Sequence, residues 1–368
     1  MKLRVFTAFS GYDSQCMALD RIGVDYELVG WSEIDKYAIQ AHNAVYPQWA
    51  DSNYGDISEI DWDKVPDSDL FTMSSPCQDF SCAGLQMGGD RNSGTRSSLL
   101  WECDYAIRKK KPKYILFENV PALVSSKFAR TFNEWQSLLA SYGYSNYVQC
   151  LNAKDYGVAQ SRNRVFMVSI LDCDKPYYFP KPFKLTKRLR DYLEQEVDEK
   201  YYLSEKMIQF INSRSSGGFY RGRINTRLAE LLMSGKIDYG YEGAIYLNAY
   251  NQTAHKEITG TIRARINASY LWYVLEPAEM DKETKIRADT DDVRNVSEYR
   301  VRRLTSRECF RLMNVDEENI DKIQSADISE TQQYKMAGNS IVVNVLAEIF
   351  RKLFIDTEPD DGQQLKLF

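Results

Sequence analysis

Two residues in the first half of the chain, Cys77 and Glu118, could act together in catalysis as a nucleophile and a proton donor. Cys77 lies in the stretch SSPCQDFS, just after the apolar run LFTM, and Glu118 follows the apolar run YILF. A thiolate is a strong nucleophile, and a carboxyl at the edge of an apolar run can hold a proton at neutral pH and then give it up. The pair suits covalent catalysis with proton transfer, although each could instead be an unrelated loop residue.

The chain offers no histidine to act as a base for this thiol. Its only two histidines, His42 and His255, stand outside any motif that would pair them with Cys77, which argues against a cysteine hydrolase and against a zinc site. Methylation of carbon 5 of cytosine needs a thiolate and an acid but no histidine. The thiolate adds to carbon 6 while the acid protonates N3, carbon 5 attacks a sulfonium methyl group, and loss of the carbon-5 proton and of the thiolate restores the ring.

Alternating strand-like and helix-like segments must position these residues. Strand and helix in turn, with short connections, predict a parallel sheet that is covered by helices on both faces. In such sheets, sites form at the carboxyl ends of the strands, where Cys77 and Glu118 both fall. The predicted strands span 2–9, 26–32, 68–74, 112–118, 144–153 and 164–170, and the predicted helices span 13–22, 35–46, 97–110 and 128–143.

Three more residues at the same predicted edge suit a cofactor that contains a nucleoside. Gly11 follows the first strand and precedes a helix, where a ligand can approach the backbone closely. Glu33 ends the second strand and could accept both hydroxyls of a ribose, and Asp56 in YGDIS could accept from an adenine amino group. Taken alone, Gly11 is better interpreted as an ordinary turn, and a solvated acid is an equally good interpretation of Glu33.

The length of 368 residues suits two lobes, and the segment 175–184, which holds three prolines, is a candidate linker between them. We interpret 181–330 as a second, smaller domain. Seven cysteines without a CxxC pair indicate a reducing compartment, and no apolar run is long enough to span a membrane.

The net charge of −5 does not by itself indicate binding to nucleic acid, but the charges are unevenly distributed. Residues 207–227 carry four arginines and no acid, and residues 300–311 carry five arginines against one glutamate. A polyanion could bind to such regions while the whole molecule stays acidic. Solvated charged faces would explain the same pattern equally well.

Several motifs, in this order along nearly the whole chain, resemble those of the cytosine-C5 DNA methyltransferase family. SSPCQDFS resembles its Pro-Cys-Gln motif, FENV its Glu-Asn-Val motif, and AQSRNRVF its Gln-x-Arg-x-Arg motif. RRLTSRECFRLM and YKMAGNSIVVNVL resemble its two last motifs. The resemblance implies a Rossmann-like α/β catalytic domain over 1–180, completed by a helix within 331–356. It also implies a mixed target-recognition domain over 181–330 and leaves 357–368 as an acidic tail.

The resemblance also assigns roles to individual residues, and it implies no metal. Cys77 would be the nucleophile and Glu118 the partner of N3, while Arg162 and Arg164 would hold the base and Glu118. The catalytic set is Cys77, Glu118, Asn119, Arg162 and Arg164. The cofactor set is Phe9, Gly11, Glu33, Ile34, Asp56, Ile57, Pro76, Leu99, Asn339 and Ser340. The DNA-binding set is Ser81, Arg91, Arg96, Arg221, Arg223, Thr261, Arg263 and Arg265.

The first motif departs from the family pattern Asp-x-Phe-x-Gly-x-Gly-Gly. The chain reads TAFSGYDS, so that Phe9 and Gly11 are kept while Thr7 replaces the acid. Asp13 and Ser14 replace the paired glycines. These replacements leave open how the turn holds the cofactor.

The implied enzyme transfers a methyl group from S-adenosyl-L-methionine, leaving S-adenosyl-L-homocysteine, to a cytosine that is flipped out of duplex DNA. We expect a monomer in the cytoplasm of a bacterial or phage-infected cell, without a membrane partner. It would serve restriction-modification or self-protection, and a restriction endonuclease could be encoded nearby. Two alternatives stay open: a tRNA cytosine-C5 methyltransferase, and a DNA-binding regulator that has lost catalysis.

Overall fold

The computed structural model describes residues 2–75, 99–126, 128–204, 245–248, 253–262, 264, 272–277 and 299–356. In the first half of the chain, the six predicted strands are confirmed as β1 (Leu3–Ala8), β2 (Tyr26–Ser32), β3 (Leu70–Met73), β4 (Tyr114–Asn119), β5 (Tyr144–Asn152) and β6 (Asn163–Leu171). The four predicted helices are confirmed as α1 (Ser14–Ile22), α2 (Lys36–Val45), α3 (Glu102–Lys110) and α4 (Ala129–Ser141).

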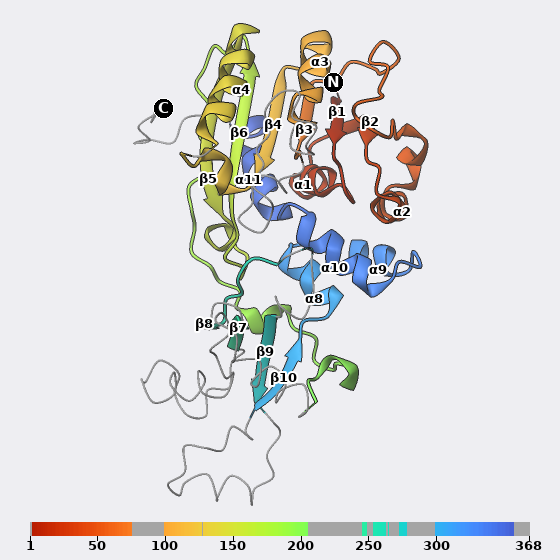
Figure 1. The fold of residues 1–368 in the computed structure, drawn as a ribbon, viewed down its shortest axis with the longest axis vertical. Helices are drawn as coiled ribbons and strands as arrows, with labels where there is room; N and C mark the ends of the chain where they lie inside the picture. Colours follow the sequence, from red (N-terminus) through yellow and green to blue (C-terminus); the bar gives the residue numbers. More distant parts are fainter. Residues whose placement is uncertain are drawn as a thin grey trace, which may run out of the picture.

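The six strands form one sheet in the order β2-β1-β3-β4-β6-β5, which Figure 1 shows in the upper part of the molecule. The prediction of a wholly parallel sheet was wrong in one strand, because β6 runs antiparallel to both β4 and β5. Between β5 and β6 there is only a 3₁₀ turn, Ala153–Tyr156, and a short loop. Without a crossover helix, the chain returns in the opposite direction.

Helices cover both faces of this sheet, as the alternating side chains of its strands require. Val5 of β1 points into a core that it shares with α1, α2 and the last helix, α11 (Val343–Phe354). Its neighbour Phe6 points to the other face, into a core that it shares with α3 and α4. In these three layers the carboxyl ends of β1 to β4 lie at one edge of the sheet.

A second, four-stranded antiparallel sheet has the order β10-β9-β7-β8. Helices from the last part of the chain lie between the two sheets in Figure 1. Phe310, Ile320 and Ile323 of these helices belong to the same apolar core as Val5. The strands are β7 (Ile245–Asn248), β8 (Thr253–Lys256), β9 (Trp272–Pro277) and β10 (Tyr299–Arg303), and the helices are α8 (Ser306–Leu312), α9 (Glu317–Gln324) and α10 (Glu330–Asn339).

A buried ion pair joins the second sheet to these helices. Arg302 of β10 donates from both Nη atoms to the Glu308 carboxylate of α8, at 2.8 Å each, and both side chains are 0% exposed. Glu308 also accepts from the Thr305 amide in a capping box, which fixes the start of α8. The pair therefore sets the direction in which the chain leaves the second sheet.

Within the part of the chain that the structure describes, no helix is both long enough and apolar enough to cross a bilayer. The same ranges contain no cluster of three or more histidine, cysteine or acidic side chains that could hold a metal ion.

Candidate active site

Glu118 and Arg164 meet at the edge of the first sheet where its parallel strands end. The Arg164 Nε lies 3.1 Å from Glu118 Oε1, and the Ser74 hydroxyl donates to Glu118 Oε2 at 2.6 Å. The two side chains of the ion pair are 7% and 16% exposed, so the interaction is shielded from water. Glu118 is the last residue but one of β4, Ser74 directly follows β3, and Arg164 is the second residue of β6. Because β6 is antiparallel, its first residues lie at the edge where the parallel strands end.

Asn119 ties this edge to the chain segment that leads to Cys77. Its buried side chain donates to the Ser75 carbonyl at 3.1 Å and accepts from the Val120 amide at 2.9 Å. Ser75 is the last residue described before Cys77. Asn119 therefore holds the base of that segment against the end of β4. Pro76 and Cys77 themselves lie outside the described residues.

The turn after β1 is held by Glu33. The Gly11 amide donates to Glu33 Oε2 at 3.0 Å, while Oε1 accepts from the Ile34 and Asp35 amides at 2.8 Å each. Gly11 has φ +59°, in the left-handed region that glycine enters without strain. Three amides thus orient the carboxylate predicted to bind a ribose. Phe9 also adopts a positive φ, 56°, which is uncommon for a residue with a side chain.

The remaining described cofactor candidates of the first half of the chain have different surroundings. Asp56 accepts from the Ser58 amide and hydroxyl, and Ile57 is buried in the same core as Phe6. Leu99 packs against that core from its edge. Ile34, in contrast, is 68% exposed, and an apolar side chain this open can offer a surface to a ligand.

The residues that depart from the family motif interact directly with one another. The Thr7 hydroxyl donates to Asp13 Oδ2 at 2.9 Å, and Asp13 Oδ1 accepts from the Cys16 amide at the start of α1. Asp13 is buried and has φ 67°, and His42 Nε2 lies 3.5 Å from its carboxylate. The carboxylate missing at position 7 is thus supplied by residue 13. Sequence reasoning treated the two replacements as separate changes, although both fall within the same short turn.

The segment of the last motif contacts the turn after β1. Ser340 caps the end of α10, and its hydroxyl accepts from Tyr12 of the turn after β1 at 2.5 Å. Asn339 beside it is exposed. The two predicted cofactor residues of the last motif therefore lie next to the glycine turn. Sequence reasoning missed Tyr12, and its place beside Gly11 was the available signal.

Arg162 contacts main-chain carbonyls from two distant segments. Its Nη1 donates to the Ile262 carbonyl at 2.8 Å, and its Nη2 donates to the carbonyls of Gly338 and Ser340 at 3.0 and 2.7 Å. The side chain is buried. The structure thus brings Arg162 to the last motif and Arg164 to Glu118, so the two arginines of one motif have different surroundings. Contact of Arg162 with a base stays a prediction.

Thr261 lies beside the Gln-x-Arg-x-Arg motif, because its hydroxyl donates to the Ser161 carbonyl at 3.0 Å. The Ile262 amide donates to the Gln160 side chain, the Ser161 amide donates to the Thr259 carbonyl, and the Thr259 amide donates to the Ala159 carbonyl. The segment that follows β8 is therefore fixed to the loop before β6. The other residues predicted to bind DNA lie outside the described ranges: Ser81, Arg91, Arg96, Arg221, Arg223, Arg263 and Arg265.

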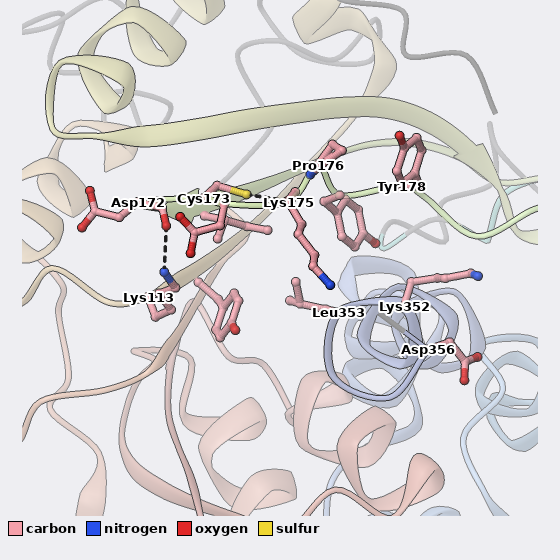
Figure 2. Close-up of a pocket in the computed structure, with 13 residues that line it drawn as sticks. Lys113, Asp172, Cys173, Lys175, Pro176, Tyr178, Lys352, Leu353 and Asp356 are labelled. Carbon is pink, nitrogen blue, oxygen red and sulfur yellow. Dashed lines mark hydrogen bonds between the residues drawn. The ribbon is translucent and has the colours of Figure 1, made fainter. Parts of the chain in front are cut away.

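A cavity of about 280 Å³ lies at the opposite edge of the first sheet, where β4 begins and β6 ends. Figure 2 shows the Lys113 ammonium group, which donates to the Asp172 carbonyl, and the Cys173 thiol, which donates to the Lys175 carbonyl. None of the residues lining this cavity is among the predicted site residues. The candidate active site is therefore the edge that holds Glu118 and Gly11.

Comparison with known proteins agrees with this geometry. A family model described as C-5 cytosine-specific DNA methylase matches residues 3–355. The chain is 34% identical to the type II methyltransferase M2.ScrFI of Lactococcus lactis subsp. cremoris, covering 96% of this chain and 99% of that protein. It is 31% identical to the orphan methyltransferase M.SPRI of Bacillus phage SPR, covering 96% and 97%.

Solved structures share the fold at lower sequence identity. The S. pombe Dnmt2 methyltransferase aligns with a TM-score of 0.65 at 19% identity, covering 97% of this chain and 99% of that one. The Entamoeba histolytica methyltransferase EhMeth aligns with a TM-score of 0.67 at 16% identity, covering 98% and 100%. These likenesses confirm the α/β architecture with its mostly parallel sheet.

Proposed function

The chain belongs to the C-5 cytosine-specific DNA methylase family and is a DNA cytosine methyltransferase, and from this premise we propose how its residues carry the reaction. The methyl donor is S-adenosyl-L-methionine, and the acceptor is carbon 5 of a cytosine flipped out of a specific duplex sequence. Cys77 is the nucleophile, and Glu118 exchanges the proton with N3.

The observation that carries this proposal is the pair of contacts on Glu118. One carboxylate oxygen faces Arg164 and the other accepts from Ser74, at the edge to which Asn119 also fixes the segment before Cys77. The shielded Glu118 carboxyl and the chain segment that leads to Cys77 thus lie together, at the same edge of the sheet as the turn after β1. Ser74 is a neutral partner, and an incoming base can replace its hydrogen bond at Oε2 while Arg164 keeps the carboxyl in place.

The reaction then balances without a histidine. The Cys77 sulfur forms a bond to carbon 6, the N3 atom takes the proton held at Glu118, and carbon 5 gains the electron density to attack a methyl group. After transfer, a base removes the proton from carbon 5, the carbon–sulfur bond breaks, and N3 returns its proton. When bound, the cofactor supplies an electrophilic methyl group on a sulfonium.

The turn after β1 fits a nucleoside cofactor. A Cβ added at Gly11 would meet nothing within 4 Å, so there is open space beside the backbone there. Glu33 is held in place next to that space, and the exposed Ile34 follows it. We propose that Glu33 binds the ribose, Asp56 the adenine amino group, and Phe9, Ile34, Ile57, Pro76 and Leu99 the apolar surface of the ligand, with Asn339 and Ser340 closing the site.

The second lobe is proposed to read the DNA. Segment 181–330 would form the target-recognition domain on a catalytic domain made of 1–180 and 331–356. Arg221, Arg223, Arg263 and Arg265 would contact phosphates or guanine edges, and Thr261 would lie beside them. Ser81, Arg91 and Arg96 would follow the flipped base. The fixed junction between Thr261 and Ser161 supports a defined position for this domain.

The relatives suggest where the enzyme works. M2.ScrFI is named a type II methyltransferase, and M.SPRI and M.SssI of Spiroplasma monobiae are named orphan methyltransferases. We propose that this chain serves restriction-modification or self-protection in the cytoplasm of a bacterial or phage-infected cell. It would act as a monomer, with or without a nuclease encoded nearby.

Trapping of the covalent intermediate tests the proposal. The protein is incubated with methyl donor and duplex that contains 5-fluorocytosine at methylated sites, which are first mapped by conversion sequencing of DNA from expressing cells. We expect a denaturant-resistant adduct through Cys77. Release of the enzyme requires loss of a proton from carbon 5, and the fluorine that replaces this hydrogen cannot be removed in that way. The Cys77→Ser variant should form no adduct but should still bind DNA, and Cys150→Ser, which changes an exposed thiol, should behave as wild type.

Three results would contradict the proposal. An adduct that persists in Cys77→Ser would overturn the assignment of the nucleophile. Labelled methyl groups that appear on total tRNA and not on genomic DNA would favour the tRNA alternative. The absence of any binding of S-adenosyl-L-homocysteine would favour a DNA-binding regulator.

A further inference from the structure

One hydrogen bond joins the two turns that are proposed to hold the cofactor. The Tyr12 hydroxyl donates to Ser340 Oγ at 2.5 Å, although the two residues are 328 positions apart in the chain. Tyr12 directly follows Gly11, and Ser340 directly follows Asn339. The bond therefore connects the glycine turn after β1 to the end of α10.

Neighbouring contacts fix both partners of this bond. The Tyr12 ring is 1% exposed and packs edge-on against Phe310 of α8, with 5.6 Å between the ring centroids. Arg162 holds the Ser340 carbonyl at 2.7 Å and that of Gly338 at 3.0 Å. Since the ring and the opposing backbone are both held in place, loss of the tyrosine hydroxyl alone would remove one of the hydrogen bonds that orient the serine side chain and leave the fold intact.

The hydrogen-bonding capacity of Ser340 is largely used. Its hydroxyl has one proton, which it donates to the Ala337 carbonyl at 3.1 Å, and one of its two lone pairs accepts from Tyr12. Burial raises the pKa of Tyr12 to about 12, so the phenol keeps its proton at neutral pH. The serine is thus held in one orientation, with one acceptor position left for a ligand.

We propose that Tyr12 is a positioning residue that sets the affinity for the cofactor by orienting the Ser340 hydroxyl. The inference rests on the proposed function, in which the glycine turn and Ser340 contact S-adenosyl-L-methionine from two sides. Tyr12 itself does not touch the reacting atoms. Its contribution is to hold the Ser340 side chain in place before the cofactor binds, which lowers the entropy cost of binding.

A double-mutant cycle on the full chain tests this route. Calorimetric titration with S-adenosyl-L-homocysteine should give a dissociation constant that is roughly 3- to 10-fold higher in Tyr12→Phe, the effect of one lost hydrogen bond. The turnover number at saturating cofactor should change less than twofold. In the Ser340→Ala background, Tyr12→Phe should have no further effect on binding, because the group that it orients is gone.

Tyr144→Phe is the matched control. Its hydroxyl is also buried and donates to a carbonyl, that of Pro112, at 2.7 Å, but it lies at the edge of the sheet away from the site. It should leave the affinity for S-adenosyl-L-homocysteine unchanged. Thermal unfolding of all variants verifies that each one folds.

Two outcomes would overturn the inference while the proposed function stands: wild-type affinity in Tyr12→Phe, or an equal loss with and without the Ser340 hydroxyl. A wild-type protein that fails to bind S-adenosyl-L-homocysteine would overturn the proposed function, and this inference with it.

Discussion

Arg164 Nε lies 3.1 Å from Glu118 Oε1, although the two residues belong to neighbouring strands that run in opposite directions. The contact forms because β6 starts where β4 ends. If β6 ran parallel to β4 over the same span, Arg164 would take the place of Ile170 beside Tyr114, roughly 13 Å along the strand from Glu118. The geometry of the candidate site thus depends on the direction of a single strand.

Removal of the Glu118 carboxyl tests its proposed role in proton transfer. Glu118→Gln keeps the shape of the side chain but cannot exchange a proton with N3. We expect the rate of methyl transfer to fall by about 10²- to 10⁴-fold, while the binding of S-adenosyl-L-homocysteine stays near that of wild type. Labelled methyl incorporation into duplex DNA measures this, with the exposed Glu134→Gln as control. A variant of near-normal rate would rule out Glu118 as the proton partner.

Arg164 is expected to orient Glu118. In Arg164→Met the carboxylate keeps Ser74 but loses its charged partner in a shielded site, so the turnover number should fall about 10- to 100-fold. Arg130→Met, which alters a highly exposed pair with Glu134, should leave the rate unchanged. The measurement is the single-turnover rate with saturating DNA. Equal rates in both variants would contradict the orienting role.

The bond between Thr7 and Asp13 predicts that their effects on stability are coupled. Thr7→Asp places a second carboxylate against a buried one and should lower the free energy of unfolding by about 3–5 kcal/mol. Asp13→Gly leaves the Thr7 hydroxyl without its acceptor and should cost about 1–2 kcal/mol. The double variant should be more stable than Thr7→Asp alone, because only one carboxylate remains. Urea unfolding measures all three, and simple addition of the two costs would contradict the coupling.

The buried pair of Arg302 and Glu308 should matter far more than ion pairs on the surface. Glu308→Ala leaves a guanidinium buried without its partner and should lower the free energy of unfolding by about 3–5 kcal/mol. Glu134→Ala removes an exposed partner of Arg130 and should cost less than about 1 kcal/mol. Thermal unfolding gives both values. A small effect at Glu308 would indicate that water reaches the pair in solution.

Asp35 links the start of α2 to Lys335 of α10, and this link should depend on pH. Although partial burial raises the pKa of Asp35, hydrogen bonds from Lys335 and from the Tyr37 amide outweigh it and hold the pKa below the usual 3.8. The contribution to stability is thus fully present above pH ~4 and disappears as the pH falls through the lowered value.

The Asp35→Asn variant measures this contribution. At pH 7 it should be less stable than wild type by about 0.2–1 kcal/mol, because asparagine can cap the helix but cannot pair with Lys335. The difference from wild type should shrink below pH ~3.8 in urea unfolding. A difference that stays constant down to pH 2 would show that charge plays no part.

Much of the catalytic lobe follows from local sequence. The apolar runs ending at Ala8, Ser32, Met73 and Asn119 predict buried strands, and their carboxyl ends place Glu118, Gly11 and Glu33 at one edge. Gly11 and Glu33 directly follow β1 and β2 and are hydrogen-bonded to each other, while Glu118 lies near the end of β4. Periodicity and strand order along the chain were enough to predict this.

What the sequence determined by itself is the set of chemical groups, the strands and helices that carry them, and the motifs that indicate the family. Only the tertiary structure decided the direction of β6, and with it the pairing of Arg164 with Glu118. It also decided that Thr7 donates a hydrogen bond to Asp13 and that Tyr12 donates one to Ser340. The physical reason is that local propensity acts over a few residues, whereas these contacts join segments whose approach is set by packing of the whole core.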